Sequence, residues 1–386
     1  MQFSNRISTL QPSIIREILK APESPDIISF AAGNPSPQTF PTADMACISA
    51  DIYASQASQA LQYGISEGFA PLREQTAAYL KNTWKIGNAK DELIITSGGQ
   101  QAIELAAKVL CNEGDIVLCE ESSFVGALNA FRSYNLQLVG VAMDGNGMDM
   151  IDLAAKLQAT RAKVIYTIPT FHNPCGTVLP VDPRTQMLSL AEQYGATIIE
   201  DSPYCELRYE GVPVPPLKSM DDSGRVIYCG SYSKTIAPGI RVGYAVARHD
   251  IITKMTVAKQ VSDVHTNLFF QHVVSRFLDE CDFNAHIKAC CQLYGKRRDA
   301  LVKGLQALDG IEFVKPCGGL FLWLKLPEGK AALDICAAAK ANKVLCVPGN
   351  AFAIDEGVSS NFIRLNFSMP DEVAIEKGVK RLAGVL

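Results

Sequence analysis

Residues 92–120 read ELIITSGGQQAIELAAKVLCNEGDIVLCE and contain two short apolar runs separated by an amphipathic stretch. Each apolar run, at 92–97 and 115–120, has the length of one buried strand, and residues 100–114 carry the spacing of a helix. A strand, a helix and a second strand in this order form a unit in which the two strands are parallel. This stretch therefore predicts an α/β fold.

The same alternation continues along the chain. Two more helical patterns lie at 150–160 and 184–195, and five more apolar runs lie at 137–143, 163–169, 196–201, 225–230 and 242–247. Strands that are apolar along their whole length are typical of a sheet covered on both faces. We predict a mostly parallel, seven-stranded sheet between helices, with ligands at the carboxyl ends of its strands.

The C-terminal third has a different pattern. Residues 250–310 are helical in character, and strand-like runs then alternate with one helix at 331–343. We predict a large α/β domain over 45–285 and a smaller α+β domain formed by 1–44 and 286–386. The seam between two such domains is a common location for a ligand.

Composition limits the function classes. The 386 residues include 36 Lys and Arg against 40 Asp and Glu, a net charge of −4 without blocks of like charge, which argues against a nucleic-acid partner. No apolar run reaches the ~18 residues of a membrane span. The first residues lack the apolar core of a signal peptide, so we expect a cytoplasmic protein without a membrane partner.

Twelve cysteines are scattered along the chain without a CxxC pair. Several lie inside predicted strands, and in a cytoplasmic protein we expect buried, reduced thiols. His286 lies near Cys290 and Cys291 in the sequence, but the paired spacing of a zinc site is missing. We therefore predict no metal.

Polar residues gather at the predicted strand ends. The GxxxxGK[ST], GxGxxG and GxSxG motifs are absent. TSGGQQ at 96–101 instead joins a strand to a helix, where the N–H groups of Gly99 and Gln100 suit an anion such as phosphate. A purely structural turn is the other interpretation. Asn173, in an Asn-Pro turn after another strand, has the same two interpretations.

Two further strand ends carry charge. Asp201 closes an apolar strand, where burial is costly unless a cation lies nearby, and Tyr204 follows it. The segment GSYSKTIAPGIRVG at 230–243 then provides Ser231, Ser233, Lys234 and Arg241. Hydroxyls and an arginine suit a phosphate. A lysine among cations and apolar walls has a lowered pKa, which a Schiff-base lysine needs.

The order of these elements resembles the class I and II pyridoxal-phosphate aminotransferases. In chain order, these elements are SFAAGNP at 29–35, LQYG at 61–64, an Asn-Pro-x-Gly loop, an Asp-x-x-Tyr pair, a Ser-x-Ser-Lys run with arginine seven residues after the lysine, and FIRLNF at 362–367. The likeness is greatest to the 2-aminoadipate, kynurenine and aromatic branch, which also includes the C-terminal domain of MocR-type regulators. It implies fold type I of the PLP-dependent transferases, with pyridoxal 5'-phosphate as cofactor.

The resemblance also implies roles around the cofactor. Lys234 would carry it as a Schiff base and later move the substrate proton, and Asp201 would keep the pyridine nitrogen protonated so that the ring acts as an electron sink. Tyr204 and Asn173 would bond its phenolic oxygen, and Phe124 would stack on the ring. The phosphate would be held by Gly99, Gln100, Ser231, Ser233 and Arg241.

Three more roles follow from the resemblance. Tyr63 would reach the phosphate in the other subunit of a homodimer, and Gly33 would lie over the substrate. Arg364 would bind the substrate α-carboxylate, although its pattern alone favours an ion pair on a domain surface. Relatives often carry a hydroxyl residue in place of Gly99 and tyrosine in place of Phe124, so this chain loses one hydrogen bond at each position.

We expect an aminotransferase that exchanges an amino group between an L-amino acid and a 2-oxo acid, such as 2-oxoglutarate, by a ping-pong mechanism. A β-lyase or decarboxylase would use the same residues, and an effector-binding module would need a DNA-binding domain for which no room precedes residue 29. The donor is open between aromatic, 2-aminoadipate-like and branched amino acids. A hydrophobic side chain is suggested by Ile14, Ile15, Ile18, Phe30 and Phe40, although packing explains these residues as well.

Overall fold

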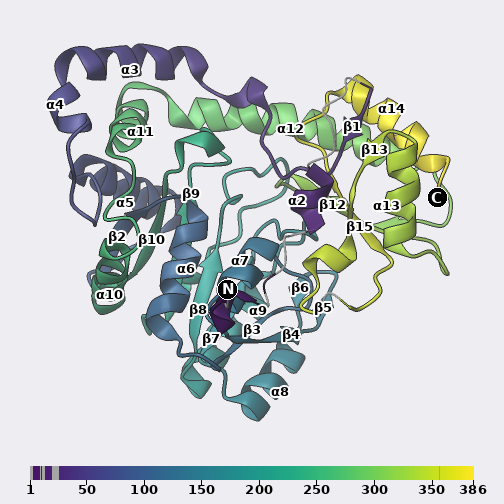
Figure 1. The fold of residues 1–386 in the computed structure, drawn as a ribbon, viewed down its shortest axis with the longest axis horizontal. Helices are drawn as coiled ribbons and strands as arrows, with labels where there is room; N and C mark the ends of the chain where they lie inside the picture. The colour runs from purple at the N-terminus through teal and green to yellow at the C-terminus, as the bar shows by residue number, and fades with distance from the viewer. Residues whose placement is uncertain (1–2, 9, 11–13, 20–25, 356) are drawn as a thin grey trace.

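A seven-stranded sheet forms the centre of the protein in its computed structural model, which describes residues 3–8, 10, 14–19, 26–355 and 357–386 (Figure 1). The helices are α1 (Asn5–Ser8), α2 (Ile14–Leu19), α3 (Thr42–Ser55), α4 (Ala57–Ala60), α5 (Ala70–Trp84), α6 (Gly99–Leu110), α7 (Val125–Arg132), α8 (Met150–Thr160), α9 (Val181–Tyr194), α10 (His249–Gln260), α11 (Leu268–Glu280), α12 (Phe283–Leu305), α13 (Ala332–Ala341) and α14 (Glu372–Ala383). The strands are β1 (Ile28–Ser29), β2 (Asp91–Thr96), β3 (Ile116–Glu120), β4 (Gln137–Val141), β5 (Met143–Asp144), β6 (Gly147–Met148), β7 (Val164–Thr167), β8 (Thr197–Asp201), β9 (Val226–Ser231), β10 (Gly243–Arg248), β11 (Glu312–Phe313), β12 (Phe321–Lys325), β13 (Val344–Leu345), β14 (Val347–Pro348) and β15 (Phe362–Asn366).

The central sheet has the order β2-β10-β9-β8-β7-β3-β4. Each of its strands corresponds to one of the seven predicted apolar runs, which confirms the predicted α/β class. All neighbours are parallel except around β10, which is antiparallel to β2 and to β9. Only residues 232–242 separate β9 from β10, and this is too short for the crossover that a parallel neighbour needs.

Helices cover both faces of this sheet, which explains why its strands are apolar throughout. Successive side chains of a strand point to opposite faces, so Ile199 of β8 packs with Ile103 of α6, whereas Ile198 packs with Leu157 of α8. Figure 1 shows α6 and α7 on one side of the strands and α8 and α9 near the other. The carboxyl ends of the parallel strands are left open between these layers.

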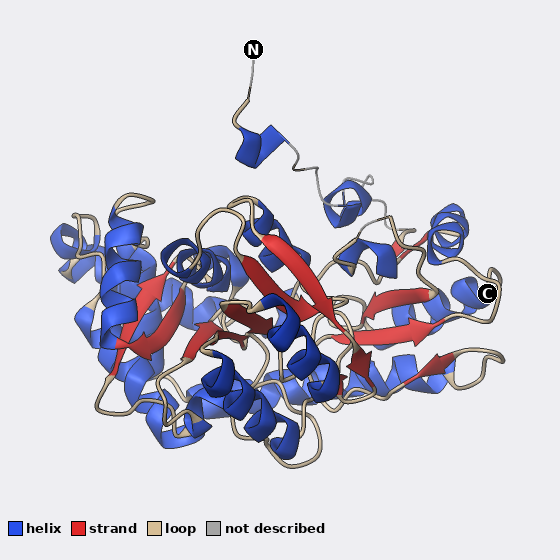
Figure 2. Cartoon of the chain, turned by 90° about the horizontal axis from the view of Figure 1, so that it is seen from below, coloured by secondary structure: helices blue, strands red, loops and turns tan. Residues whose placement is uncertain are grey.

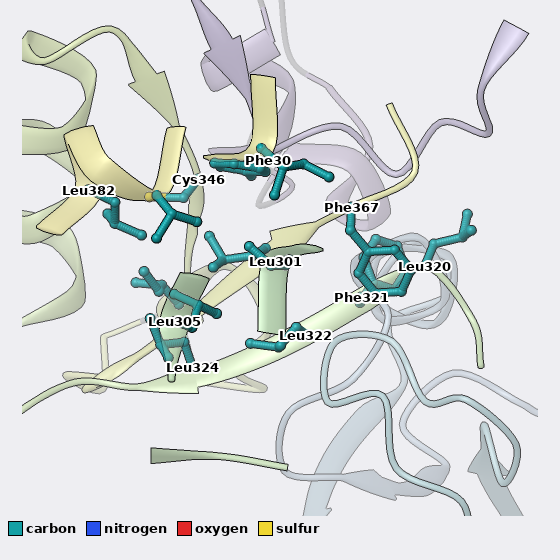
Figure 3. Close-up of a cluster of buried hydrophobic side chains, with 14 of the residues drawn as sticks. Phe30, Leu301, Leu305, Leu320, Phe321, Leu322, Leu324, Cys346, Phe367 and Leu382 are labelled. Atoms are coloured by element: carbon teal, nitrogen blue, oxygen red, sulfur yellow. The ribbon is translucent and has the colours of Figure 1, made fainter. Parts of the chain in front are cut away.

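A second, four-stranded sheet has the order β11-β12-β15-β14. Its core joins Leu322 of β12 to Leu301 of α12, Leu382 of α14 and Phe30 of the N-terminal segment (Figure 3). The N-terminal segment is tied to this part by β1, which pairs in parallel with β13 at Ile28. The sequence analysis identified this α+β block but did not predict α14 as a helix.

Helix α12 links the two sheets. Its first residue, Phe283, packs edge-on against Tyr79 of α5 with ring centroids 5.3 Å apart, and its last residue, Leu305, lies in the core of the four-stranded sheet. The predicted domain boundary between 285 and 286 falls in the first turn of this helix. The division into 45–285 and 1–44 with 286–386 stays a prediction.

The cysteines differ in part from expectation. None of the twelve forms a disulfide, but only five are buried, Cys47 is exposed and the others are half-buried. His286 lies against the backbone, with Nε2 2.6 Å from the carbonyl oxygen of Thr235. Among the described residues, no helix is both long and apolar enough to cross a membrane.

Candidate active site

A cavity of about 540 Å³ opens at the carboxyl ends of the central strands, beside the second sheet. Phe321 of β12 lines it from the smaller sheet and Ile15 of α2 from the N-terminal segment. The predicted site residues that line it are Gly33, Gly99, Gln100, Phe124, Asn173, Asp201, Tyr204, Ser231, Ser233, Lys234, Arg241 and Arg364. Segments more than 300 residues apart in sequence therefore meet in one cavity.

Lys234 follows the end of β9 and reaches into the cavity, where its Nζ donates to the carbonyl oxygen of Gly33 at 2.9 Å. Burial and the positive charges of Arg364 and Arg241 lower the pKa of Lys234 to about 8, against the opposing effect of Asp201. About a fifth of this amine is therefore neutral near physiological pH, far more than of an ordinary lysine. Neutral amines are nucleophilic, so the environment suits covalent chemistry at a carbonyl carbon.

Asp201 ends β8 and is 4% exposed. Its Oδ2 accepts a hydrogen bond of 2.7 Å from the hydroxyl of Tyr166, which lies on the neighbouring strand β7. Burial raises the pKa of Asp201 to about 7, while Tyr166 and the charge of Lys234 act in the opposite direction. A cation brought into the cavity beside this carboxyl would stabilise its ionised form.

Arg364 lies on β15, and its guanidinium lies between the rings of Phe321 and Phe352, 4.3 and 4.7 Å from their centroids. It donates to Asn173 Oδ1 at 2.8 Å and to the carbonyl of Ala31 at 2.7 Å. Its buried Nε–H has no acceptor among the described residues. With only 2% of the residue exposed, the surface ion pair that the sequence pattern favoured is wrong.

Asn173 and Tyr204 lie between the lysine and the arginine ends of the cavity. Because Arg364 is a donor, the amide of Asn173 must present its oxygen to it, and the NH₂ group is left for the cavity. Tyr204 is 4% exposed and packs edge-on against Phe321, with centroids 5.7 Å apart. Both residues therefore hold polar groups at fixed places in the cavity wall.

The other end of the cavity is built to receive an anion. Helix α6 begins at Gly99 without a side-chain cap, so its first N–H groups are open. Gly98 before it has φ +82°, and a Cβ there would overlap the Arg241 guanidinium. The hydroxyls of Ser231 and Ser233 are 2.9 Å apart at the end of β9, beside this helix end. Positive charge, open N–H groups and hydroxyls thus converge.

Three of the predicted residues, Gln100, Phe124 and Gly33, line the cavity beside other parts of the protein. The side-chain amide of Gln100 donates one hydrogen bond to the carbonyl of Gly126 at 2.8 Å, so this side chain is already anchored at α7. Phe124 caps α7 and lines the cavity. A Cβ added at Gly33 would lie 3.3 Å from the ring of Phe321. The missing side chain therefore leaves room for this ring as well as for any substrate.

Tyr63 is the predicted site residue that lies outside the cavity wall. Its side chain is 81% exposed and touches His265 edge-on, with ring centroids 5.8 Å apart. Exposed apolar side chains surround the connection between α10 and α11, among them Leu61, Val261 and Val264. This surface is separate from the cavity of its own chain.

Several residues of the site could not be recognised in the sequence. Tyr166 lies inside an apolar run, where a tyrosine looks like core, and only the pairing of β7 with β8 places it beside Asp201. Phe321 and Phe352 come from separate segments of the smaller sheet region. Because side chains alternate between the two faces of a strand, the position of Tyr166 in its strand was the one feature of the sequence that could have identified it. No local feature of the sequence identifies the two phenylalanines.

The chain is similar to known proteins along almost its whole length. Residues 25–382 match the family model described as aminotransferase class I and II. The chain is 41% identical to aromatic-amino-acid aminotransferase 1 of Thermococcus litoralis, over 99% of this chain and 93% of the relative.

Two solved structures match almost the whole chain. The kynurenine aminotransferase of Pyrococcus horikoshii, described in complex with PMP, has a TM-score of 0.95 and 41% identity over 99% of this chain and 96% of that one. The alpha-aminoadipate aminotransferase of Thermus thermophilus, complexed with N-(5'-phosphopyridoxyl)-L-leucine, has a TM-score of 0.92 and 34% identity over 100% of this chain and 97% of that one.

Proposed function

The chain belongs to the class I and II aminotransferases, and we propose that it uses Lys234, Asp201 and Arg364 to transaminate amino acids with apolar or aromatic side chains. It is a pyridoxal-phosphate-dependent enzyme that moves an amino group between an amino acid and a 2-oxo acid. The observation that carries the residue assignment is that a nucleophilic lysine, a buried carboxyl and a buried guanidinium with an open donor line one cavity.

The residues present fit the cofactor. The open N-terminus of α6 would hold the phosphate together with Ser231, Ser233 and Arg241, and Phe124 would pack on the ring. Asp201 would face the protonated pyridine nitrogen, which supplies the cation that its buried carboxyl needs. Asn173 and Tyr204 would face the phenolic oxygen. When bound, the cofactor supplies an electron sink for the bond broken at the substrate Cα.

Lys234 and Arg364 then have separate tasks. Lys234 would hold the cofactor covalently and, when released from it, would move the proton at the substrate Cα, for which a pKa of about 8 is well suited. Arg364 would receive the substrate carboxylate through its open Nε–H. With the carboxylate held at Arg364, whose guanidinium lies between Phe321 and Phe352, the amino group and Cα would lie toward Lys234.

The proposed substrate class follows from the charges of the cavity. In the part of its wall that the structure describes, the cations are Lys234, Arg241 and Arg364, and each already has a task. The remaining wall near Arg364 is formed by Phe321 and Ile15. A second substrate carboxylate would be buried there without a counter-ion, which is costly. The structure thus favours apolar and aromatic donors over glutamate or 2-aminoadipate.

A half-reaction tests the function and the substrate class together. Mixing holoenzyme with phenylalanine or leucine should convert the bound cofactor to its amine form, which changes its absorbance, and glutamate should do so with at least about tenfold lower efficiency. Returning 2-oxoglutarate or pyruvate then identifies the acceptor. Because donor and acceptor bind in the same cavity, the charge argument applies to the second carboxylate of 2-oxoglutarate as well, and it favours pyruvate over the 2-oxoglutarate expected from the resemblance. No conversion with any amino acid would overturn the function. Release of pyruvate or CO₂ would favour the lyase and decarboxylase alternatives.

The pKa of Lys234 predicts how cofactor uptake depends on pH. At a pKa of about 8 the amine is about half neutral at pH 8, whereas an ordinary lysine is less than about 1% neutral there. The rate at which cofactor-free protein takes up pyridoxal phosphate should therefore rise with pH and level off above about 8. Stopped-flow absorbance measures this rate. A rate that keeps rising to pH 10 would show an ordinary lysine.

We also propose a homodimer that covers the surface around Tyr63. Tyr63, Leu61 and Val261 are strongly exposed, and α1 has no buried residue and stands clear of the other described elements (Figure 2). Exposed apolar side chains gathered in one place mark an interface. Light scattering should give twice the chain mass of 41.8 kDa. A monomeric mass at micromolar concentration would contradict the proposal.

A further inference from the structure

Glu120 is a buried carboxylate at the end of β3 that has no task in the reaction described so far. It is 1% exposed, and its Oε1 accepts hydrogen bonds from the hydroxyl of Thr167 at 2.6 Å and from the backbone N–H of Ile168 at 3.1 Å. Its Oε2 accepts from the hydroxyl of Ser123 at 3.2 Å. Burial would raise the pKa of Glu120, but His172 and the hydrogen bonds hold it below its usual value.

His172 is the fourth group against this carboxylate. Its Nε2 lies 3.7 Å from Glu120 Oε2, and the residue is 1% exposed. The backbone N–H of Cys175 donates to Nδ1 of His172, so Nδ1 is the acceptor and Nε2 carries the hydrogen that faces Glu120. Nε2 has no hydrogen-bond partner among the described residues, and the Glu120 carboxylate 3.7 Å away is the polar group that faces it. The imidazole therefore depends on Glu120 for its polar contact on this side.

The residues that contact Glu120 lie in the cavity wall or directly before residues of that wall. Ser123 directly precedes Phe124, Ile168 lines the cavity itself, and His172 directly precedes Asn173. These residues belong to two loops, one between β3 and α7 and one between β7 and α9, which are separate in the sequence. One carboxylate thus joins the two loops that present a ring, an aliphatic side chain and an amide to the cavity.

The contacts continue to the substrate end of the cavity. Asn173 Oδ1 accepts a hydrogen bond from Arg364 at 2.8 Å. The backbone N–H of Ser123 donates to the carbonyl of Phe352 at 2.8 Å, and the ring of Phe352 packs on the Arg364 guanidinium. The β7–α9 loop therefore reaches Arg364 directly through Asn173, and the β3–α7 loop reaches it through Phe352.

We propose that Glu120 is a positioning residue of this aminotransferase, which aligns Asn173 and Arg364 for the substrate carboxylate by binding both loops at once. The inference rests on the function proposed above for Arg364. It predicts that loss of the Glu120 carboxylate weakens carboxylate binding although Glu120 touches no substrate. A purely structural role would lower stability and leave binding unchanged.

Three variants separate these roles. Glu120→Ala removes all contacts, whereas Glu120→Gln keeps an oxygen for Thr167 and Ile168 but places an NH₂ group against the Nε2–H of His172. Glu200→Gln is the matched control, because Glu200 is equally buried on the neighbouring part of the same sheet and accepts from the backbone of Leu217 and Lys218, outside the cavity.

The measurement is the Kd of each holoenzyme for 3-phenylpropanoate, a carboxylate without an amine, read from the absorbance of the bound cofactor. We expect Kd to rise about tenfold or more in Glu120→Ala and about threefold in Glu120→Gln, with matching increases in KM for phenylalanine. Glu200→Gln should lower Tm but leave Kd within about twofold of the parent enzyme. If Glu120→Ala does not fold, Glu120→Gln, which conserves volume, decides the question.

Rescue at His172 supplies a second test. His172→Gln can place an N–H donor where Nε2 stood and should keep Kd near that of the parent enzyme, whereas His172→Leu should raise it as Glu120→Gln does. Unchanged Kd in the Glu120 variants of an active enzyme would overturn the positioning role alone. A parent enzyme that transaminates no amino acid would instead overturn the proposed function.

Discussion

Replacing Lys234 by alanine is expected to lower turnover by about 10⁴-fold or more, while the chain still folds and binds pyridoxal phosphate through its other contacts. The expected loss is large because the covalent attachment and the proton transfer both depend on this one amine. The fold should tolerate the change, because Lys234 makes one hydrogen bond, to Gly33, and burial already disfavours its charge. Steady-state kinetics and thermal unfolding measure the two effects.

Lys234→Arg is the matched control for charge. Arginine keeps the positive charge at this end of the cavity but does not form the covalent attachment, so it should be as inactive as the alanine variant. A small added amine should restore part of the activity of Lys234→Ala, because it can move the proton that the lysine no longer moves. Near-normal activity in Lys234→Ala would show that another residue carries the cofactor.

Replacing Arg364 by alanine is expected to lower kcat/KM for phenylalanine by about 10²–10³-fold, mainly through a higher KM. The substrate carboxylate would then enter a buried site without its counter-ion, and the open Nε–H that receives it would be gone. Asn173 would also lose its partner, and a void would remain between Phe321 and Phe352. Some loss of stability should accompany the kinetic effect.

Two controls separate carboxylate binding from packing. Arg364→Lys keeps a charge but cannot form two parallel hydrogen bonds, so its KM should lie between those of the parent enzyme and Arg364→Ala. Phenethylamine, which resembles phenylalanine without the carboxylate, should be as poor a donor for the parent enzyme as for the variant. An unchanged KM for phenylalanine in Arg364→Ala would assign Arg364 a structural role only.

Much of the fold could be predicted because it depends on local patterns. Continuous apolar runs identified every strand of the central sheet, and the carboxyl ends of parallel strands meet at one edge, which brought Asp201 and Lys234 together. The antiparallel direction of β10 was not predicted, because an apolar run carries no information about direction. The short helix α7 was missed as well, since its eight residues give a weak periodic signal.

The rest of the site depends on contacts between distant segments. Arg364 could not be recognised as buried between Phe321 and Phe352 from its own strand, because those rings arrive from other parts of the chain. Glu120 shows the same limit, since a glutamate at a strand end is usually solvated, and only folding surrounds it with three hydrogen-bond donors and the imidazole of His172. Tyr63 lies outside the cavity of its own chain, and the role expected for it depends on the proposed homodimer.

Lys234 is the residue that we propose to carry the cofactor of this aminotransferase. Reduction of the holoenzyme with borohydride fixes the cofactor to the amine that holds it, and mass spectrometry of the resulting peptides then locates it. The structure predicts one phosphopyridoxyl group per chain, on the peptide that contains Lys234, and its loss when phenylalanine is added before reduction. Label on another lysine, or no label in an active enzyme, would contradict the assignment.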